Sequence, residues 1–185
     1  LITYWVLAIT MVLTLTTKED QENAIRSNAK WMLCLCMGFA TLHKLISPDF
    51  LDGTFLHYCL LTNKKFSFIT DALQPINQVT PIYATNQTLM TQNKAATQLI
   101  GNTAIMRPLA YWASQFMILY EGLLTLLFLL PEKTPKINLL RHSLLLFFCG
   151  TLYHFIRVPF FGLILLLLGY TLLNKSQKKL QYIYL

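Results

Sequence analysis

Long apolar runs, separated by short polar connections, constrain this chain more than any other feature of its sequence. Of its 185 residues, 55% are hydrophobic and only 12% are charged, which is about half the charged fraction of an ordinary soluble domain. A helix that crosses a bilayer needs about 20 mostly apolar residues. The runs therefore predict an all-α fold, an integral membrane helical bundle, and argue against a soluble globular domain.

Five runs are candidate membrane spans, and one long polar connection, residues 47–108, separates the second from the third. We treat the whole chain, 1–185, as a single transmembrane domain. Pro159 interrupts the last apolar stretch, which favours a helical hairpin and leaves one bent helix as the alternative. The predicted spans are residues 1–16, 30–46, 109–130, 139–156 and 158–173.

The basic residues lie mainly between the apolar runs. The net charge of +7 comes from 15 basic and 8 acidic residues. This distribution is typical of topology signals and of contact with anionic lipids, and not of a nucleic-acid-binding face. If residues 139–173 form a hairpin, then the connections at 17–29 and 131–138 and the tail share one side. The positive-inside rule makes that side cytoplasmic in a multi-pass protein, and residues 47–108 face the opposite side.

The 47–108 connection is not uniformly polar. Residues 54–61 are apolar enough to form a helix along the membrane interface. From 77 to 98, Asn, Gln and Thr residues around Pro81 predict irregular structure. Asn86 begins a triplet that fits the N-glycosylation pattern, although such triplets are common by chance.

The four cysteines, Cys34, Cys36, Cys59 and Cys149, show no paired Cys-x-x-Cys spacing. Three of them lie in apolar runs. Buried free thiols therefore explain them better than a metal site or a disulfide framework.

Lys44 ends the second apolar run, just before a Ser-Pro break and an acidic turn closed by Gly53. An ionisable group at membrane depth is costly and is therefore a candidate functional group. Burial disfavours the charged form of a lysine, which can leave a neutral amine available as a base or nucleophile. The alternative is that Lys44 snorkels, burying its methylenes and keeping its ammonium among the lipid headgroups.

The 109–130 span carries a carboxylate, Glu121, about 18 Å along its axis at 1.5 Å per residue, and so near the middle of the bilayer. Glu121 is either a proton relay or an ion-pair partner of a neighbouring helix, or it is a neutral group hydrogen-bonded to a backbone or hydroxyl oxygen. By contrast, Arg141 and His142 stand at a helix start beside a basic connection. We expect these two residues to be interfacial anchors.

The predicted topology brings Lys44 to the same side as Arg107 and the turn that contains His154 and Arg157. His154 and Arg157 are three residues apart and share a helical face, whereas His43 and Lys44 point about 100° apart. A pocket here could hold an amphipathic ring, with Lys44 or His154 touching an oxygen atom. The alternative is that these cations contact lipid phosphates.

Three motifs follow one another along the chain: ATLHKL at 40–45 with SPDFLDG at 47–53, EGLL at 121–124 before Pro131, and YHF at 153–155 with FFG at 160–162. In this order, over roughly residues 30–170, they resemble the HTTM (horizontally transferred transmembrane) domain family. That family includes the membrane part of vitamin K-dependent gamma-carboxylase.

The resemblance implies a carboxylase-like membrane fold and a quinone or quinol as the cofactor. It also implies that Lys44 is the base that deprotonates the reduced quinone. From the residues and the resemblance together, the catalytic candidates are Lys44 and His154, and the ligand-binding candidates are His43, Arg107, Glu121 and Arg157.

We expect an accessory subunit of a larger membrane complex, with the lipid bilayer and other membrane subunits as its partners. A protein carboxylase would need a site for its protein substrate. The sizeable segment outside the predicted spans is 47–108, and its mostly polar, proline-interrupted sequence does not suit such a site. The alternative is a quinol-dependent membrane enzyme that uses Lys44 as its base. A small transporter is a third class, but repeated halves are not visible. The chain starts inside an apolar run without Met, so we expect residues upstream of Leu1.

Overall fold

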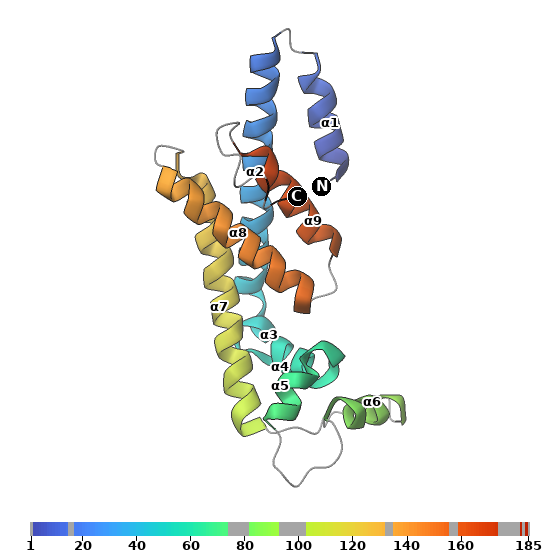
Figure 1. The fold of residues 1–185 in the computed structure, drawn as a ribbon. Helices are drawn as coiled ribbons and strands as arrows, with labels where there is room; N and C mark the ends of the chain where they lie inside the picture. The colour runs from blue at the N-terminus through green and yellow to red at the C-terminus, as the bar shows by residue number, and fades with distance from the viewer. Residues whose placement is uncertain are drawn as a thin grey trace. The chain divides into compact units, whose positions relative to one another are not determined.

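The computed structural model of the chain describes residues 2–14, 17–73, 82–92, 103–131, 135–155, 159–173, 182 and 184. These residues form helices joined by turns and short connections, with no strand among them, which confirms the all-α prediction for this part of the chain. The elements are α1 (Ile2–Val12), α2 (Lys18–Ile46), α3 (Pro48–Leu51), α4 (Thr54–Thr62), the 3-10 helix η1 (Lys64–Phe66), α5 (Ser67–Ala72), α6 (Ile82–Gln92), α7 (Thr103–Leu129), α8 (Pro135–Phe155) and α9 (Pro159–Thr171) (Figure 1).

Among the described residues, α2 and α7 are the two helices that are long and apolar enough to cross a membrane. The apolar part of α7 runs over Ala104–Leu129, and a shorter apolar helix covers Phe160–Thr171. The predicted spans 30–46 and 109–130 thus fall within or very close to α2 and α7. The bundle of five spans stays a prediction.

The chain divides into two compact units, one formed by Leu1–Phe39 with Gly122–Leu185 and the other by Ala40–Glu121. Both long helices contribute residues to each unit. The single transmembrane domain expected from the sequence stays a prediction.

In the first unit, α8 and α9 contact each other, which favours the hairpin over one bent helix. The Sγ atom of Cys149 lies 3.8 Å from the carbonyl oxygen of Gly162. Leu145 and Leu165 are fully buried in this unit. The connection between the two helices lies outside the described residues.

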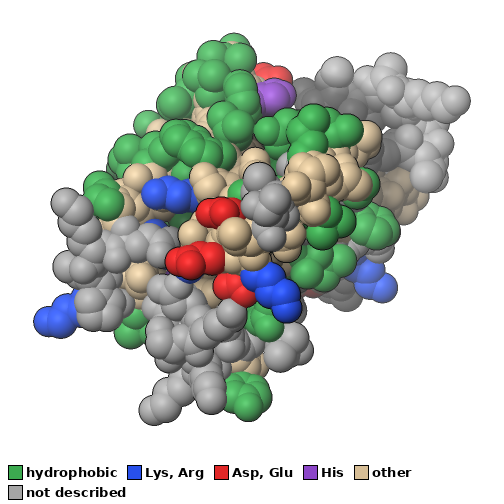
Figure 2. Space-filling model, turned by 90° about the horizontal axis from the view of Figure 1, so that it is seen from above, with side chains coloured by type: hydrophobic (Ala, Val, Ile, Leu, Met, Phe, Trp, Pro, Cys, Tyr) green, Lys and Arg blue, Asp and Glu red, His purple; other side chains and the backbone are tan. Residues whose placement is uncertain are grey.

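Charged side chains mark the beginning of α2. Lys18, Glu19, Asp20 and Glu22 are exposed there, and the side chain of Asp20 accepts a hydrogen bond from the hydroxyl group of Thr17. Figure 2, seen from above the view of Figure 1, shows acidic and basic side chains close together near the middle of the picture. The polar end of α2 therefore suits an aqueous environment.

In the second unit, α4 packs on the N-terminal half of α7. Leu56 and Leu60 form a buried cluster with Ala110, and Ala113 and Met117 pack against it. The helix predicted over 54–61 is confirmed as α4 (Thr54–Thr62). Leu56 and Leu60 are four residues apart, so a helix places both on the face that packs against α7.

Helix α6 corrects the prediction of irregular structure between 77 and 98, since residues 82–92 are helical. Ile82 is buried with Leu61 and Met106. The side-chain amides of Asn86 and Gln87 donate hydrogen bonds to the carbonyl oxygens of Leu61 and Thr62, at 3.2 and 2.9 Å. Carbonyl groups at the end of a helix need such partners, and α6 supplies them to α4.

Candidate functional site

The second unit contains an ion pair between the last turn of α2 and Glu121, in the C-terminal half of α7. The Nζ atom of Lys44 lies 2.6 Å from Oε2 and 2.8 Å from Oε1 of Glu121. The side chain of Lys44 is 18% exposed and that of Glu121 is 4% exposed. This geometry does not fit a lysine that extends into water, and it joins two residues that the sequence analysis placed at different depths.

An aromatic ring covers the ammonium group. Phe50, in α3, lies with its ring centroid 5.4 Å from Lys44 Nζ, within the range of a cation–π contact. Phe50 is itself buried and stacks on Phe55 at a centroid distance of 5.7 Å. The pair is therefore shielded from solvent on the side of α3.

The helix break after α2 places this ring. The α2 helix ends at Ile46 and α3 starts at Pro48, because proline fits the first turn of a helix but interrupts an existing one. Gly53 then adopts φ +79°, a left-handed conformation that favours glycine. A Cβ atom at this position would lie 2.7 Å from the Cα and N atoms of Tyr111, so the turn and α7 are in close contact.

A side chain of α7 also forms a hydrogen bond to the end of α3. The Nε2 atom of Gln115 donates a 2.8 Å hydrogen bond to the carbonyl oxygen of Leu51. Ser114, the residue before Gln115, is fully buried, and its hydroxyl group has no hydrogen-bond partner among the described residues. The buried face of α7 thus carries polar groups at Ser114 and Glu121 among apolar residues such as Ile118.

The ion pair limits what Lys44 can do. Both carboxylate oxygens of Glu121 lie within hydrogen-bonding distance of the Lys44 amine, so this amine is already engaged. It becomes a base only after its proton passes to Glu121, which leaves a neutral amine beside a neutral carboxylic acid. The arrangement can therefore fix two helices together or transfer a proton between two groups.

The other candidate residues are not brought to this pair within the described residues. His43 is exposed although it neighbours Lys44. Arg107 is exposed too, and lies 14 residues before Glu121 in α7, about 21 Å along the axis at 1.5 Å per residue. The side chain of His154 and the whole of Arg157 lie outside the described residues.

Arg107 instead lies near a histidine that the sequence analysis did not select. Burial lowers the pKa of the His57 imidazole, and the positive charge of Arg107 lowers it further. The imidazole is therefore neutral at pH 7. Its Nε2 atom is buried without a hydrogen-bond partner among the described residues.

Arg141 and His142, expected from the sequence to be interfacial anchors, have no side chain free to reach an interface. Both are buried in the first unit, at 1% and 0% exposure. The guanidinium carbon of Arg141 lies 5.2 Å from the ring centroid of Phe128, and Nδ1 of His142 lies 2.9 Å from the hydroxyl group of Tyr184. Aromatic side chains from distant parts of the chain cover them, which their position at a helix start did not reveal.

Neither metal nor disulfide chemistry is visible in the part of the chain that the structure describes. It contains no group of three His, Cys, Asp or Glu residues that could hold a metal ion. All four cysteines are free, with Cys34 and Cys149 buried and Cys36 and Cys59 half-buried.

The sequence did contain a signal for the ion pair. Lys44 and Glu121 are charges of opposite sign in two apolar segments, and charges buried in such segments usually pair with each other. An ion pair was one of the alternatives for Glu121, but Lys44 was not named as its partner because Lys44 was assigned to the end of its span. Phe50, Gly53 and Gln115 carried no separate signal, since their roles depend on contacts across the fold.

No family model matches the chain, and neither a curated protein nor a solved structure matches it. The likeness to HTTM domains therefore rests on the three motifs alone.

Proposed function

We propose that this chain is an integral membrane protein with an HTTM-like fold that serves as an accessory subunit of a larger membrane complex. The observation that carries the proposal is the exposure of large apolar side chains along α2 and α7. A soluble monomer rarely leaves contiguous surfaces of this kind open to water.

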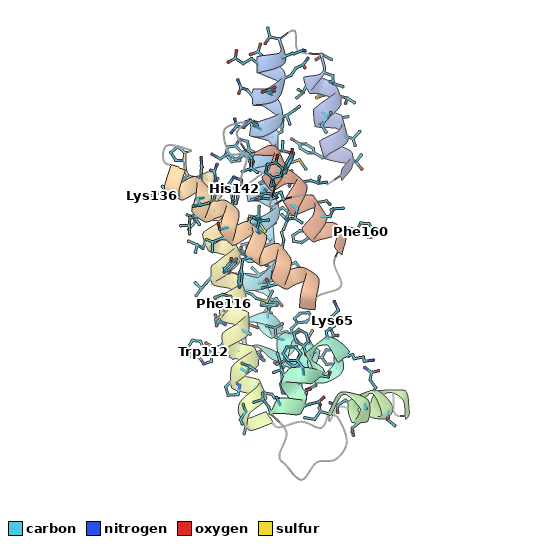
Figure 3. All side chains as sticks on the ribbon, in the orientation of Figure 1. Lys65, Trp112, Phe116, Lys136, His142 and Phe160 are labelled. Carbon is cyan, nitrogen blue, oxygen red and sulfur yellow. The ribbon has the colours of Figure 1, made fainter. Side chains whose placement is uncertain are left out.

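The exposed side chains of α7 form one stripe, with successive spacings of three and four residues. Trp112 is 69% exposed and Leu119 is 72% exposed, and Figure 3 shows Trp112 and Phe116 pointing outward from the helix. The stripe contains Trp112, Phe116, Leu119, Leu123 and Leu126.

A matching stripe follows α2, again at helical spacing. Its members are Trp31, Leu35, Phe39, Leu42 and Ile46. Lipid chains can cover such stripes, and so can helices of other subunits, because association in lipid depends on close packing rather than on the hydrophobic effect. The closed Lys44–Glu121 pair supports a structural role over a catalytic one, since the amine is already engaged.

Two experiments test this proposal. The chain should remain in the membrane fraction after alkaline extraction, and after mild solubilisation it should migrate with a mass well above that of a 21.3 kDa monomer in its micelle. Leu119→Glu should reduce the larger species, because it places a charge in the apolar stripe. Asn23→Glu, at an exposed position in the polar first part of α2, is the matched control and should leave the larger species intact.

A monodisperse monomer that oxidises an added quinol would refute the subunit proposal. So would extraction of the natural chain by alkali, because a chain that alkali extracts is not embedded in the bilayer. An unchanged complex in the Leu119→Glu variant would move the interface away from α7.

The second candidate is a quinol-dependent enzyme, favoured by the carboxylate that touches Lys44. Glu121 would accept a proton from the Lys44 ammonium, and the neutral amine would then accept a proton from a quinol hydroxyl group. Overall, the quinol would lose two electrons and two protons to oxygen, which gives the quinone and hydrogen peroxide. The apolar ring of Phe50 suits a neighbouring quinone ring.

Lys44→Met tests this second candidate, with His43→Gln as its control at the adjacent, exposed position. Oxygen-dependent loss of an added quinol should disappear in the first variant and persist in the second. Equal rates in both variants and in the natural chain would exclude Lys44 as the base.

A further inference from the structure

We infer that residues 47–61 form a re-entrant segment at the depth of the lipid hydrocarbon, with the outer face of α4 in contact with lipid chains, rather than a loop outside the membrane. This inference rests on the proposed insertion of α7 into a membrane. It changes which side chains meet lipid and where α2 ends.

The length of α7 fixes the depth of its middle. The apolar part, Ala104–Leu129, has 26 residues and is about 39 Å long at 1.5 Å per residue. The hydrocarbon layer takes about 20 of them, so about six residues extend beyond it. If all six extra residues precede the hydrocarbon layer, the layer begins at Ala110. If all six follow the layer, the layer ends at Leu123. Residues 110–123 lie inside the layer in every placement, and tilting the helix draws further residues in.

The contacts of the 47–61 segment fall on this middle stretch. Gly53 approaches the backbone of Tyr111. The carbonyl oxygen of Leu51 accepts the hydrogen bond from Gln115, and Leu56 packs against Ala110. A segment in contact with these residues of α7 shares their depth.

The end of α2 shares that depth too. Lys44 is paired with Glu121, which lies inside the 110–123 stretch, and α2 ends two residues after Lys44. This helix therefore stops within the layer, and the chain turns there instead of leaving the membrane.

The backbone of the segment has internal hydrogen-bond partners, as a place at membrane depth requires. Non-helical backbone at membrane depth needs hydrogen-bond partners within the protein. Asp52 Oδ1 accepts a bond from the Thr54 amide at 2.8 Å, and Gln115 binds the carbonyl oxygen of Leu51. Local backbone bonds provide further partners: Ser47 N to Lys44 O, Phe50 N to Ser47 O, Leu51 N to Ser47 O, Asp52 N to Pro48 O, Gly53 N to Phe50 O and His57 N to Gly53 O.

The outer face of α4 has the chemistry of a lipid contact. Phe55 and Tyr58 are three residues apart, so they share one face of the helix, and both are about half exposed. The opposite face is buried through Leu56 and Leu60. Large aromatic side chains facing outward at this depth suit acyl chains.

The exposed carboxylates before α4 require a different environment. Asp49 and Asp52 are both exposed, and a charge in hydrocarbon is costly unless water reaches it. The corner between α3 and α4 therefore faces water that enters the layer locally, while the side of α4 that carries Phe55 faces lipid.

Site-directed spin labelling in vesicles of a neutral phospholipid tests the depth, with all four cysteines replaced by alanine. Labels at Phe55→Cys and Tyr58→Cys should collide readily with oxygen and rarely with a water-soluble nickel chelate, as a label at Leu119→Cys should. A label at Asp52→Cys should collide with the chelate, as one at Asn23→Cys should.

The controls separate this inference from the proposed function. If Leu119→Cys reports lipid while Phe55→Cys and Tyr58→Cys report water, the re-entrant segment is overturned and the membrane insertion stands. If Leu119→Cys also reports water, both are overturned.

A second measurement covers the case in which the cysteine-free chain does not fold. Benzoylphenylalanine placed at Phe55 in the otherwise natural chain should form photoadducts with lipid acyl chains, detected by mass spectrometry, as it should at Leu119. Adducts at Leu119 without adducts at Phe55 would overturn the inference.

Discussion

Lys44 and Glu121 form a charge pair through both carboxylate oxygens, at 2.6 and 2.8 Å, although 77 residues separate them in the sequence. The pair joins the last turn of α2 to the C-terminal half of α7 within one compact unit. Its burial makes it the group in the site whose removal has the clearest expected effect.

Removing one member of the pair should destabilise the protein strongly. Glu121→Leu leaves the Lys44 ammonium buried without its carboxylate, and the loss of a partner in a buried pair costs about 3–5 kcal/mol. The double variant Lys44→Met with Glu121→Leu should recover most of that loss, because no charge is then buried. Unfolding in detergent by increasing denaturant measures both effects, and His43→Gln is the neutral control. A single variant as stable as the natural chain would contradict a buried pair.

Gly53→Ala should destabilise the turn that begins α4. A left-handed φ costs a non-glycine residue about 1–2 kcal/mol, and the new Cβ atom would also meet the backbone of Tyr111 at 2.7 Å. We expect a loss above about 2 kcal/mol from the two effects together. Gly150→Ala is the matched control, because nothing lies within 4 Å of a Cβ atom there, and helix propensity predicts a small gain of up to about 1 kcal/mol.

A glycan should not be added at Asn86. This side chain is fully buried and donates to the Leu61 carbonyl oxygen, so a folded chain does not present it to a transferase. Expression in a glycosylating cell, followed by glycosidase treatment, should give no change in gel mobility. A mobility shift that Thr88→Ala abolishes would show that Asn86 is accessible.

The same residue should contribute to stability. Asn86→Ala leaves a buried helix-end carbonyl group without its donor, which costs about 1–3 kcal/mol. Thr88→Ala removes the glycosylation triplet but leaves this bond in place, and should be close to neutral because Thr88 is exposed. Thermal unfolding of the two variants separates the structural role of Asn86 from the triplet.

Gln115→Leu should destabilise the turn that connects α3 to α4. It removes the donor to the Leu51 carbonyl oxygen, a bond worth about 1 kcal/mol, and faster hydrogen exchange should appear at the amides of residues 52–57. Ala113→Leu, at a neighbouring position on the same helix, retains Gln115 and tests whether any change of packing has the same effect. Unchanged exchange in Gln115→Leu would show that local backbone bonds suffice.

The long helices could be predicted from the sequence because their signal is local. Apolar residues recur at helical spacing through α2 and α7, and Pro159 marks the start of α9 as expected from its effect on backbone bonds. Such local patterns are sufficient to predict that the fold is all-α.

The contacts that build the site could not be predicted in the same way. Lys44 meets Glu121 because of the register between two helices, and nothing near either residue specifies that register. Arg141 is buried by Phe128, which precedes it by a whole connection. In α6, a polar composition suggested irregular structure, whereas Asn86 and Gln87 are needed by the end of α4.

The separation of the charge pair along the chain has a consequence for biosynthesis. In a chain inserted as proposed, Lys44 leaves the ribosome 77 residues before Glu121, which at about 5–20 residues per second is a delay of roughly 4–15 s. During that interval the second helix holds an ammonium group without its counter-ion. Helix α2 must therefore stay at the translocon, or tilt its end toward water, until α7 is synthesised. The order of synthesis thus delays the final insertion of α2 in the bilayer.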